Sequence, residues 1–442
     1  MLIPSQIILT YVRPSYWLSG LEVCWGIITG MFALVKNAQQ VYALRVLLGL
    51  CESSAWPGMM TLLMHWYTPS ELAKRMGFYH SCQAVGSMMS GALQVAIRSS
   101  MHGLHGMSTT PSGQGLARVV ADCEIQGMPG WRWLFVVNAI MTVVVGALGF
   151  VLLPDTPNNP NPRAFWFKEG HAQLAMERLE RHGKAEPKKM TWAAAKRAFS
   201  SWVIYFIPIL YIATVLETYG NNYFNLFLKS LKNPDGSPRW TTSEVNAIPI
   251  GGSAINVVFV WIWAILSDLF MTRWTLIVAQ AVIGLAVCIA MSVWTAHPTT
   301  TSLAVAYAAN FITFTAMGTA PLIFAWLADI LPHDPEARTL IVGVSIAGYY
   351  AISAWSQVLV WPATQAPYYK YAWQSAIAIG VLVIIMTCVL RYIDARYLEP
   401  KREIYMATVI ETVAKDDGEP AEEVVRDSVD RKVKSTATTP QV

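Results

Sequence analysis

The sequence has few charged residues. Asp, Glu, Lys and Arg make up 14% of the 442 residues, whereas 54% of the residues are hydrophobic. A soluble domain carries about 25% charged residues, so this deficit means that most of the surface faces something other than water. The formal net charge of +4 does not indicate a nucleic-acid partner.

The sequence also lacks the motifs of several kinds of chemistry. Its six cysteines lie far apart and form no Cys-x-x-Cys or Cys/His cluster, which argues against a metal site or a disulfide framework. It has no Gly-x-x-x-x-Gly-Lys-Ser/Thr loop, so ATP-driven pumping has no support. No nucleophile–base constellation occurs, and we therefore expect neither an enzyme nor a cofactor.

The sequence contains many long apolar runs. A helix of about 20 apolar residues crosses a bilayer. The windows of that length are 15–35, 41–64, 76–97, 133–153, 202–224, 245–267, 274–294, 302–328, 338–361 and 372–393. Lipid offers the backbone no hydrogen-bond partners, so these spans must be helices. With the apolar start 1–10, we expect an all-α polytopic membrane protein of about 10–11 transmembrane helices.

Basic residues set the orientation of such a chain. They are densest in the connection 154–200, and Lys and Arg accumulate on the cytoplasmic side. We therefore expect an N-terminal transmembrane bundle (1–153), a cytoplasmic linker (154–200), a C-terminal six-helix bundle (201–394) and a disordered cytoplasmic tail (395–442).

Several motifs together resemble one family. They are Arg45-x-x-x-Gly49-x-x-Glu52 with Trp56-Pro-Gly, Gly130-Trp-Arg-Trp-Leu-Phe135, and Trp361-Pro-x-x-x-Ala-Pro-Tyr-Tyr-Lys370. The chain resembles major facilitator superfamily transporters of the anion:cation symporter family, in the fungal allantoate/pantothenate permease branch. The resemblance implies a fold of two helical bundles.

Two features depart from that family. Residues 3–9 resemble the end of the family's second helix, so on this alignment the first helix and most of the second are missing. We expect an N-terminally truncated chain whose true start lies upstream of Met1. The segment Met107–Gly127 has no counterpart in relatives and shows no periodicity. It is either an extracytoplasmic loop insertion or a translated intron.

Two charged residues lie within the span 41–64. Arg45, Gly49 and Glu52 share one helix face. Because Arg near the centre of a membrane helix costs about 2.5–3.5 kcal/mol, this face should line a cavity or a bundle interior. We expect Glu52 to carry the coupling proton, and Arg45 to hold Glu52 or the substrate carboxylate. The alternative is a static Arg–Glu clasp between helices. Gly49 would let another helix approach closely.

A polar stripe opens the second half of the chain. Glu217, Asn221, Asn222 and Tyr223 lie in the span 202–224 beside Gly220, which predicts a locally broken helix and a substrate-binding face. Asp268 and Arg273 flank a predicted cytoplasmic loop, where we expect gating contacts between helices.

The predicted function is secondary active transport. The resemblance implies proton-coupled uptake of a small organic anion such as pantothenate or a related carboxylate. Export of a fungal metabolite, or a non-transporting relic or sensor, remains as an alternative. The expected partners are the anion, protons and the lipid bilayer. We expect a monomeric, multi-pass protein of the plasma membrane with a cytoplasmic C-terminus.

Overall fold

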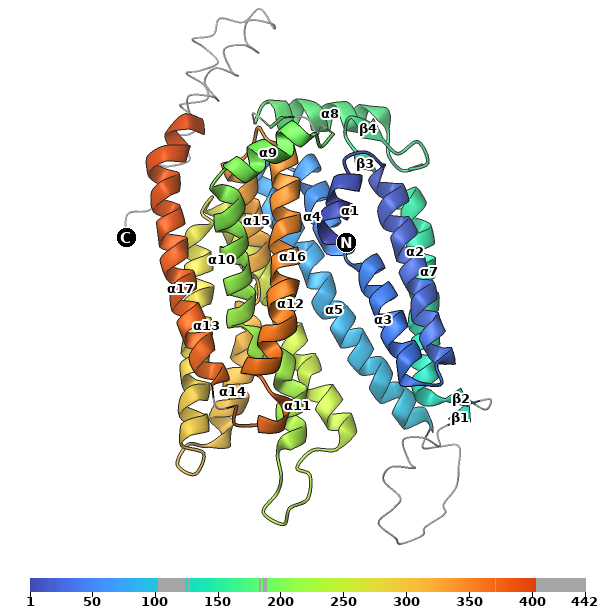
Figure 1. The fold of residues 1–442 in the computed structure, drawn as a ribbon, viewed down its shortest axis with the longest axis vertical. Coiled ribbons are helices and arrows are strands. Elements are labelled where there is room, and N and C mark those ends of the chain that lie inside the picture. Colours follow the sequence, from blue (N-terminus) through green and yellow to red (C-terminus); the bar gives the residue numbers. More distant parts are fainter. Residues whose placement is uncertain (102–123, 126–127, 183, 186–188, 370, 403–442) are drawn as a thin grey trace, which may run out of the picture.

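The computed structural model describes residues 1–442 except 102–123, 126–127, 183, 186–188, 370 and 403–442. Figure 1 shows two groups of long helices side by side, with a short segment lying across one end of both. The N-terminal helices form one group and the C-terminal helices form the other.

The N-terminal group contains the helices before residue 153. They are α1 (Leu2–Ile8), α2 (Pro14–Met31), α3 (Ala38–Glu52), α4 (Ala55–Trp66), α5 (Pro69–Met101) and α7 (Gly130–Leu152). A 3-10 turn, Phe32–Leu34, follows α2. The short strands β1 (Glu124–Ile125) and β2 (Met128–Pro129) pair antiparallel before α7.

The segment across the end of the molecule joins the two groups. It consists of an antiparallel hairpin, β3 (Asp155–Thr156) and β4 (Asn159–Pro160), followed by α8 (Glu169–Glu180) and α9 (Trp192–Ser200). We call residues 154–200 the linker. Thr191 caps α9, since its side chain accepts a hydrogen bond from the Ala194 amide.

The C-terminal group contains the remaining helices. They are α10 (Val203–Glu217), α11 (Phe224–Ser230), α12 (Thr242–Leu269), α13 (Trp274–Ala296), α14 (Leu303–Thr313), α15 (Thr319–Ile330), α16 (Pro335–Val360) and α17 (Ala372–Ile393). Three 3-10 turns, Tyr219–Tyr223, Phe314–Ala316 and Ala363–Gln365, and a π turn, Asp394–Leu398, complete it. A capping box of Thr241 and Glu244 starts α12.

The described residues contain nine helical segments that are long and apolar enough to cross a membrane. They are Pro14–Leu34, Ala38–Trp66, Arg132–Leu152, Val203–Ser230, Thr242–Leu269, Trp274–Ala296, Leu303–Ile330, Pro335–Gln365 and Ala372–Arg402. Each overlaps one predicted window, which confirms the all-α membrane fold. The predicted window 76–97 falls within α5, which is 33 residues long but more polar than the other spans.

Helix α5 packs against a helix of the C-terminal group. This helix packs along the length of α12, and small residues allow the two backbones to approach closely. A Cβ at Gly77 would lie 2.6 Å from the Ala264 Cβ. Farther along, the Trp261 indole donates a hydrogen bond to the Ser81 hydroxyl, at 3.0 Å. One face of α5 therefore meets protein and not lipid.

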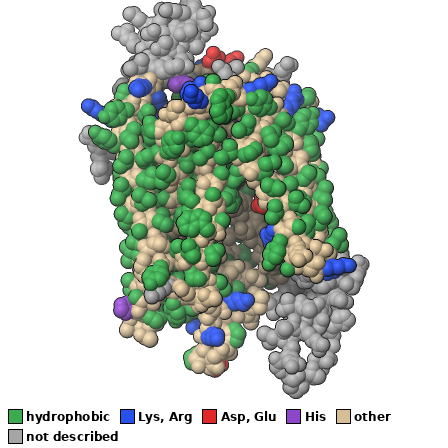
Figure 2. Space-filling view, viewed as in Figure 1, with side chains coloured by type: hydrophobic (Ala, Val, Ile, Leu, Met, Phe, Trp, Pro, Cys, Tyr) green, Lys and Arg blue, Asp and Glu red, His purple; other side chains and the backbone are tan. Residues whose placement is uncertain are grey.

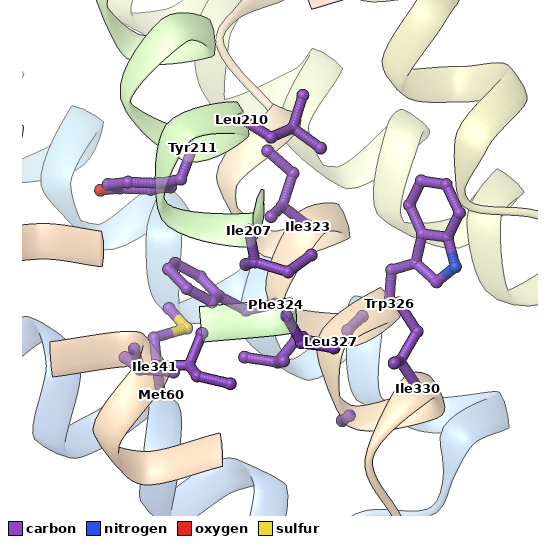
Figure 3. Packing of buried hydrophobic residues seen from close by; sticks show 14 of the residues in the cluster. Met60, Ile207, Leu210, Tyr211, Ile323, Phe324, Trp326, Leu327, Ile330 and Ile341 are labelled. Carbon is purple, nitrogen blue, oxygen red and sulfur yellow. The ribbon is translucent and has the colours of Figure 1, made fainter. Parts of the chain in front are cut away.

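The largest cluster of buried apolar side chains joins the two groups of helices. Figure 3 shows Met60 of α4 beside Ile341 of α16, with Phe324 of α15 and Ile207 of α10 packed around them. These four side chains are buried. The N-terminal group thus contributes α4 and the start of α5 to a core that is otherwise built largely from the C-terminal group.

Most of the outer surface is hydrophobic. Figure 2 shows apolar side chains over the middle of the molecule, with Lys and Arg at both ends and several at the end that carries the linker. Exposed apolar residues such as Leu148 of α7 and Ile385 of α17 are those that lipid would cover.

Two predicted segments lie largely outside the described residues. Of Met107–Gly127, only Glu124–Ile125 is described, as strand β1. Of the predicted tail 395–442, residues 395–402 continue α17 as helix. Arg402 donates a hydrogen bond to the buried Asp394 at 2.6 Å, which fixes this extension. Residues 403–442 are not described.

The α5–α12 contact yields a first prediction. Gly77→Ala places a methyl group against Ala264, and such overpacking costs about 1–3 kcal/mol. Gly86→Ala is the matched control on the same helix, because no atom lies within 4 Å of its added Cβ. We expect Gly77→Ala to lower the unfolding temperature of the purified protein and Gly86→Ala to leave it unchanged or slightly raised. Equal effects would contradict the close packing at Gly77.

Candidate functional site

A hollow lies between the two groups of helices. Figure 2 shows it opening on the face in view, with acidic and basic side chains at its margin. Arg45 and Glu52 of α3 are both exposed. They are seven positions apart, which is about 10 Å along the helix axis. The predicted pair therefore lies on an accessible helix face.

Each member of the pair has its own surroundings. The Arg45 guanidinium lies over the Phe32 ring, 5.4 Å from its centroid. Glu52 lies within Coulombic range of the Tyr350 hydroxyl, which belongs to α16 of the C-terminal group. Arg45 and Glu52 do not pair with each other among the ion pairs of the described residues. The arrangement is that of two separate charges, not of a closed clasp.

The close helix contact expected at Gly49 is not found. Among the described residues, no heavy atom lies within 4 Å of a Cβ built at this position. The expectation was wrong for the part of the chain that the structure describes, because the face carrying Gly49 is exposed and no helix packs on it.

A series of neighbouring tyrosines connects the surroundings of Glu52 with the 3-10 turn Tyr219–Tyr223. The Tyr349 and Tyr350 rings of α16 lie 5.1 Å apart, and Tyr349 is within Coulombic range of Tyr219. The Tyr219 ring is in turn 6.0 Å from that of Tyr223. Sequence reasoning missed Tyr349 and Tyr350. The available signal was an adjacent pair of hydroxyl-bearing residues in the middle of an apolar span.

The predicted break in the first span of the second half is confirmed. α10 ends at Glu217, a 3-10 turn covers Tyr219–Tyr223, and α11 begins at Phe224. Gly220 is required at this turn, because a Cβ there would lie 2.8 Å from the rings of Trp361 and Trp373. The Tyr223 ring stacks on Trp361 at 5.2 Å and 6°.

The two asparagines of the predicted stripe lie at this break. Asn222 is exposed and Asn221 is half-buried. The buried Oδ1 of Asn221 has no hydrogen-bond partner among the described residues. With Tyr223, these side chains offer polar groups beside an aromatic wall.

Glu217 is placed differently from the rest of the stripe. It is 4% exposed, and a Cβ at Gly284 of α13 or at Gly380 of α17 would lie 2.7 or 2.8 Å from its Oε1. The side chain therefore points into the C-terminal group, between α13 and α17. This placement does not support the direct substrate contact that the sequence predicted for Glu217.

A buried charge cluster closes the linker end of the molecule. The Arg273 guanidinium donates to Asp268 Oδ1 at 2.5 Å and to Asp329 Oδ2 at 3.1 Å. The Asp268 and Arg273 side chains are 0% and 4% exposed. Burial alone would lower the pKa of Arg273, but the Asp329 and Asp268 carboxylates outweigh burial and raise it. Sequence reasoning named Asp268 and Arg273 but missed Asp329.

This cluster also binds the N-terminal group. The Lys74 backbone amide of α5 donates to Asp268 Oδ2 at 2.8 Å. Arg273 donates to the Pro69 carbonyl at 2.5 Å. We call Asp268, Arg273 and Asp329 the charge cluster. It holds the start of α5 against the end of α12, across the boundary between the two groups.

The linker inserts a lysine beside the charge cluster. Lys184 is 7% exposed and its Nζ donates to the Tyr67 carbonyl at 2.8 Å. Burial, followed by the positive charge of Arg338, lowers the pKa of Lys184 to about 7. Sequence reasoning missed this residue, because a lone lysine in a basic linker is ordinarily solvent-exposed.

The described part of the chain contains no group of three or more His, Cys, Asp or Glu side chains that could hold a metal ion.

Comparison with known proteins finds similarity to membrane transporters. The model of the Major Facilitator Superfamily matches residues 11–233. The MFS transporter PfmaC of Pestalotiopsis fici is 30% identical over 390 residues, covering 87% of this chain and 66% of that protein. The pantothenate transporter liz1 of Schizosaccharomyces pombe is 27% identical over 410 residues, covering 91% of this chain and 72% of that protein.

Two solved structures share the fold. The proton:xylose symporter XylE superposes with a TM-score of 0.64 and 14% identity, over 90% of this chain and 83% of that chain. The Escherichia coli fucose:proton symporter FucP superposes with a TM-score of 0.55 and 12% identity, over 88% of this chain and 86% of that chain.

The lowered pKa of Lys184 predicts a pH dependence of stability. Between about pH 7 and pH 10, the lysine is neutral in the folded protein and protonated in the unfolded chain, so the free energy of unfolding rises with pH. One proton contributes at most about 1.4 kcal/mol per pH unit. Lys184→Met should remove this rise, measured by chemical denaturation. Lys196→Met, on exposed α9, is the control; identical slopes in both variants would contradict the assignment.

The charge cluster predicts a cost for losing one carboxylate. Asp268→Asn leaves the buried Arg273 short of an anionic partner, and breaking a buried ion pair costs about 3–5 kcal/mol. We expect a lower free energy of unfolding and faster proteolysis near Pro69, at the start of α5. Asp235→Asn, in an exposed loop, should leave both quantities unchanged. If Asp268→Asn changed neither the free energy of unfolding nor the rate of proteolysis, the cluster would not hold the two groups together.

Proposed function

The chain belongs to the Major Facilitator Superfamily, and from that premise we propose that it is a secondary transporter that takes up a small organic anion together with protons. The observation that carries this proposal is the placement of Arg45 and Glu52. Both are exposed on one face of a helix within a membrane span, and they do not neutralise each other.

The proposed substrate is a carboxylate such as pantothenate. An exposed Arg45 offers a fixed positive charge on one face of α3, and a guanidinium binds carboxylates with two parallel hydrogen bonds. Asn222 and Tyr223 at the helix break offer neutral polar groups, and Trp361 offers an apolar surface. Such a combination suits a small anion with a polar or amide-bearing body. The name of liz1, a pantothenate transporter, supports the same class.

The proposed proton carrier is Glu52. A carboxyl group on a membrane helix gains and loses a proton with the access of water and the approach of a cation. Arg45 is two turns away, and the Tyr350 hydroxyl of the other group of helices lies within Coulombic range of Glu52. A substrate anion bound at Arg45 would alter the charge near Glu52. Substrate binding at Arg45 and protonation of Glu52 would therefore influence each other.

The charge cluster is the proposed gate. It fastens α5 to α12 at the linker end, whereas the hollow opens on the face shown in Figure 2. Alternating access requires these contacts to separate and re-form. We place the linker end in the cytoplasm because basic residues gather in the linker. The proposed setting is a monomer in the plasma membrane, with two bundles (1–153 and 201–394) joined by the linker.

The test is uptake of labelled pantothenate and related carboxylates by transporter-deficient cells that express this chain. Glu52→Gln should abolish accumulation driven by external acid and spare exchange of labelled for unlabelled substrate, since exchange needs no net proton movement. Arg45→Gln should raise KM by about ten-fold or more, equivalent to at least 1.4 kcal/mol.

The control is Glu180→Gln on α8, an exposed carboxylate outside the hollow, which should leave both measurements unchanged. Proton-driven accumulation that survives Glu52→Gln would assign the coupling to another residue. A chain that takes up none of these carboxylates would overturn the proposed substrate class.

A further inference from the structure

A second cavity lies apart from the hollow, at the linker end of the molecule. Its volume is about 220 Å³. Segment 9–14, helix α4 and the hairpin β3–β4 form one part of its wall, and Lys189 of the linker with the first turns of α16 form the rest. The cavity therefore spans the boundary between the two groups of helices.

The charged side chains of this cavity are basic. Arg13 and Lys189 line it, His65 adds a neutral imidazole, and none of the described lining residues is Asp or Glu. Arg13 donates a hydrogen bond to Asn159 Oδ1 at 2.7 Å, which holds the guanidinium at the hairpin. Its five N–H donors leave it free to bind a second acceptor.

A buried cation strengthens the positive charge of this region. Arg338 of α16 is 2% exposed, and its Nε and Nη1 have no hydrogen-bond partner among the described residues. It lies between Pro335 and Thr339 in the sequence, both of which line the cavity. It is also within Coulombic range of His65.

The nearest carboxylates do not form an ion pair with Arg338. Asp334 and Glu336 are bound by Arg197, at 2.7 and 3.8 Å, and Asp329 is bound by Arg273 at 3.1 Å. A buried cation without a close partner is costly. An anion in the adjacent cavity would offset part of that cost.

We propose that this cavity binds a phosphate group, with Arg13 and Lys189 as its direct contacts and Arg338 as the buried charge behind them. Guanidinium and ammonium groups are the usual ligands of phosphate. The volume fits a phosphate-sized anion with a few water molecules, each of which takes about 30 Å³. The phosphate belongs either to a small soluble compound or to a lipid headgroup.

Occupancy of this cavity has a consequence for the molecule. α4 comes from the N-terminal group and α16 from the C-terminal group, and both line the cavity. A ligand held by both groups stabilises the arrangement in which they are in contact. Phosphate binding would thus favour the form that is closed at the linker end. This inference does not depend on which substrate occupies the hollow.

The first experiment measures the unfolding temperature of the purified full chain in sodium phosphate and in sodium chloride at equal ionic strength. If the ligand is a soluble anion, the unfolding temperature should rise to a plateau with increasing phosphate and should not rise with chloride. This is the behaviour expected for a ligand that binds only the folded state. In Arg13→Gln/Lys189→Gln, the half-saturating concentration should rise about ten-fold, which is 1.4 kcal/mol. Lys196→Gln, an exposed linker lysine outside the cavity, should behave like the unchanged protein.

The second experiment tests the lipid source. The same variants are placed in bilayer discs of phosphatidylcholine, with or without about one tenth phosphatidic acid. Stabilisation by phosphatidic acid that disappears in Arg13→Gln/Lys189→Gln would assign the phosphate to a headgroup. The proposal is overturned if neither probe stabilises the chain, or if the double variant responds as strongly as the unchanged protein. Because both readouts are binding measurements, loss of transport would not affect them.

Discussion

The buried ion pair between Asp268 and Arg273 is the contact on which the arrangement of the two groups of helices depends. Both side chains are almost fully removed from solvent, where an unpaired charge would be very costly. The pair is tolerated because each side chain has further partners: Arg273 also binds Asp329 and the Pro69 carbonyl, and Asp268 also accepts from the Lys74 amide. Since Pro69 and Lys74 belong to α5, satisfying these charges requires the N-terminal group to lie against α12.

The linker is part of this closed end and not a loose tether. Lys184 is buried beside the charge cluster and donates to the Tyr67 carbonyl. Farther along, the Met190 amide donates to the Thr10 hydroxyl at 3.0 Å, and the Tyr11 hydroxyl donates to the Met190 carbonyl. Separation of the two groups at this end would break these bonds together with those of the charge cluster. The linker conformation and the closure of this end are therefore coupled.

The sequence was sufficient for features that depend on local pattern. Apolar windows predicted the spans, since a bilayer demands about 20 apolar residues, and the Gly220 region predicted the helix break. Orientation between helices could not be predicted in the same way. Glu217 and Asn221 share a helix face by spacing, yet the break between them and the glycines of α13 and α17 turn Glu217 into the C-terminal group. Tyr350 lies within Coulombic range of Glu52 although the two residues are far apart in the sequence, and no local pattern records such a neighbour.

Arg273, Arg45 and Arg338 differ in how many anionic and hydrogen-bonding partners surround each guanidinium. This difference distinguishes their roles. Arg273 is buried with two carboxylates, so it holds a structure whose rearrangement requires an exchange of partners. Arg45 is exposed and pairs with no carboxylate among the described residues, so water can solvate it until an anion arrives. Arg338 is buried with two guanidinium nitrogens unpaired among the described residues. The carboxylates of Asp334, Asp329 and Glu336 act on its charge without forming an ion pair with it, and an anion in the neighbouring cavity would add to that compensation.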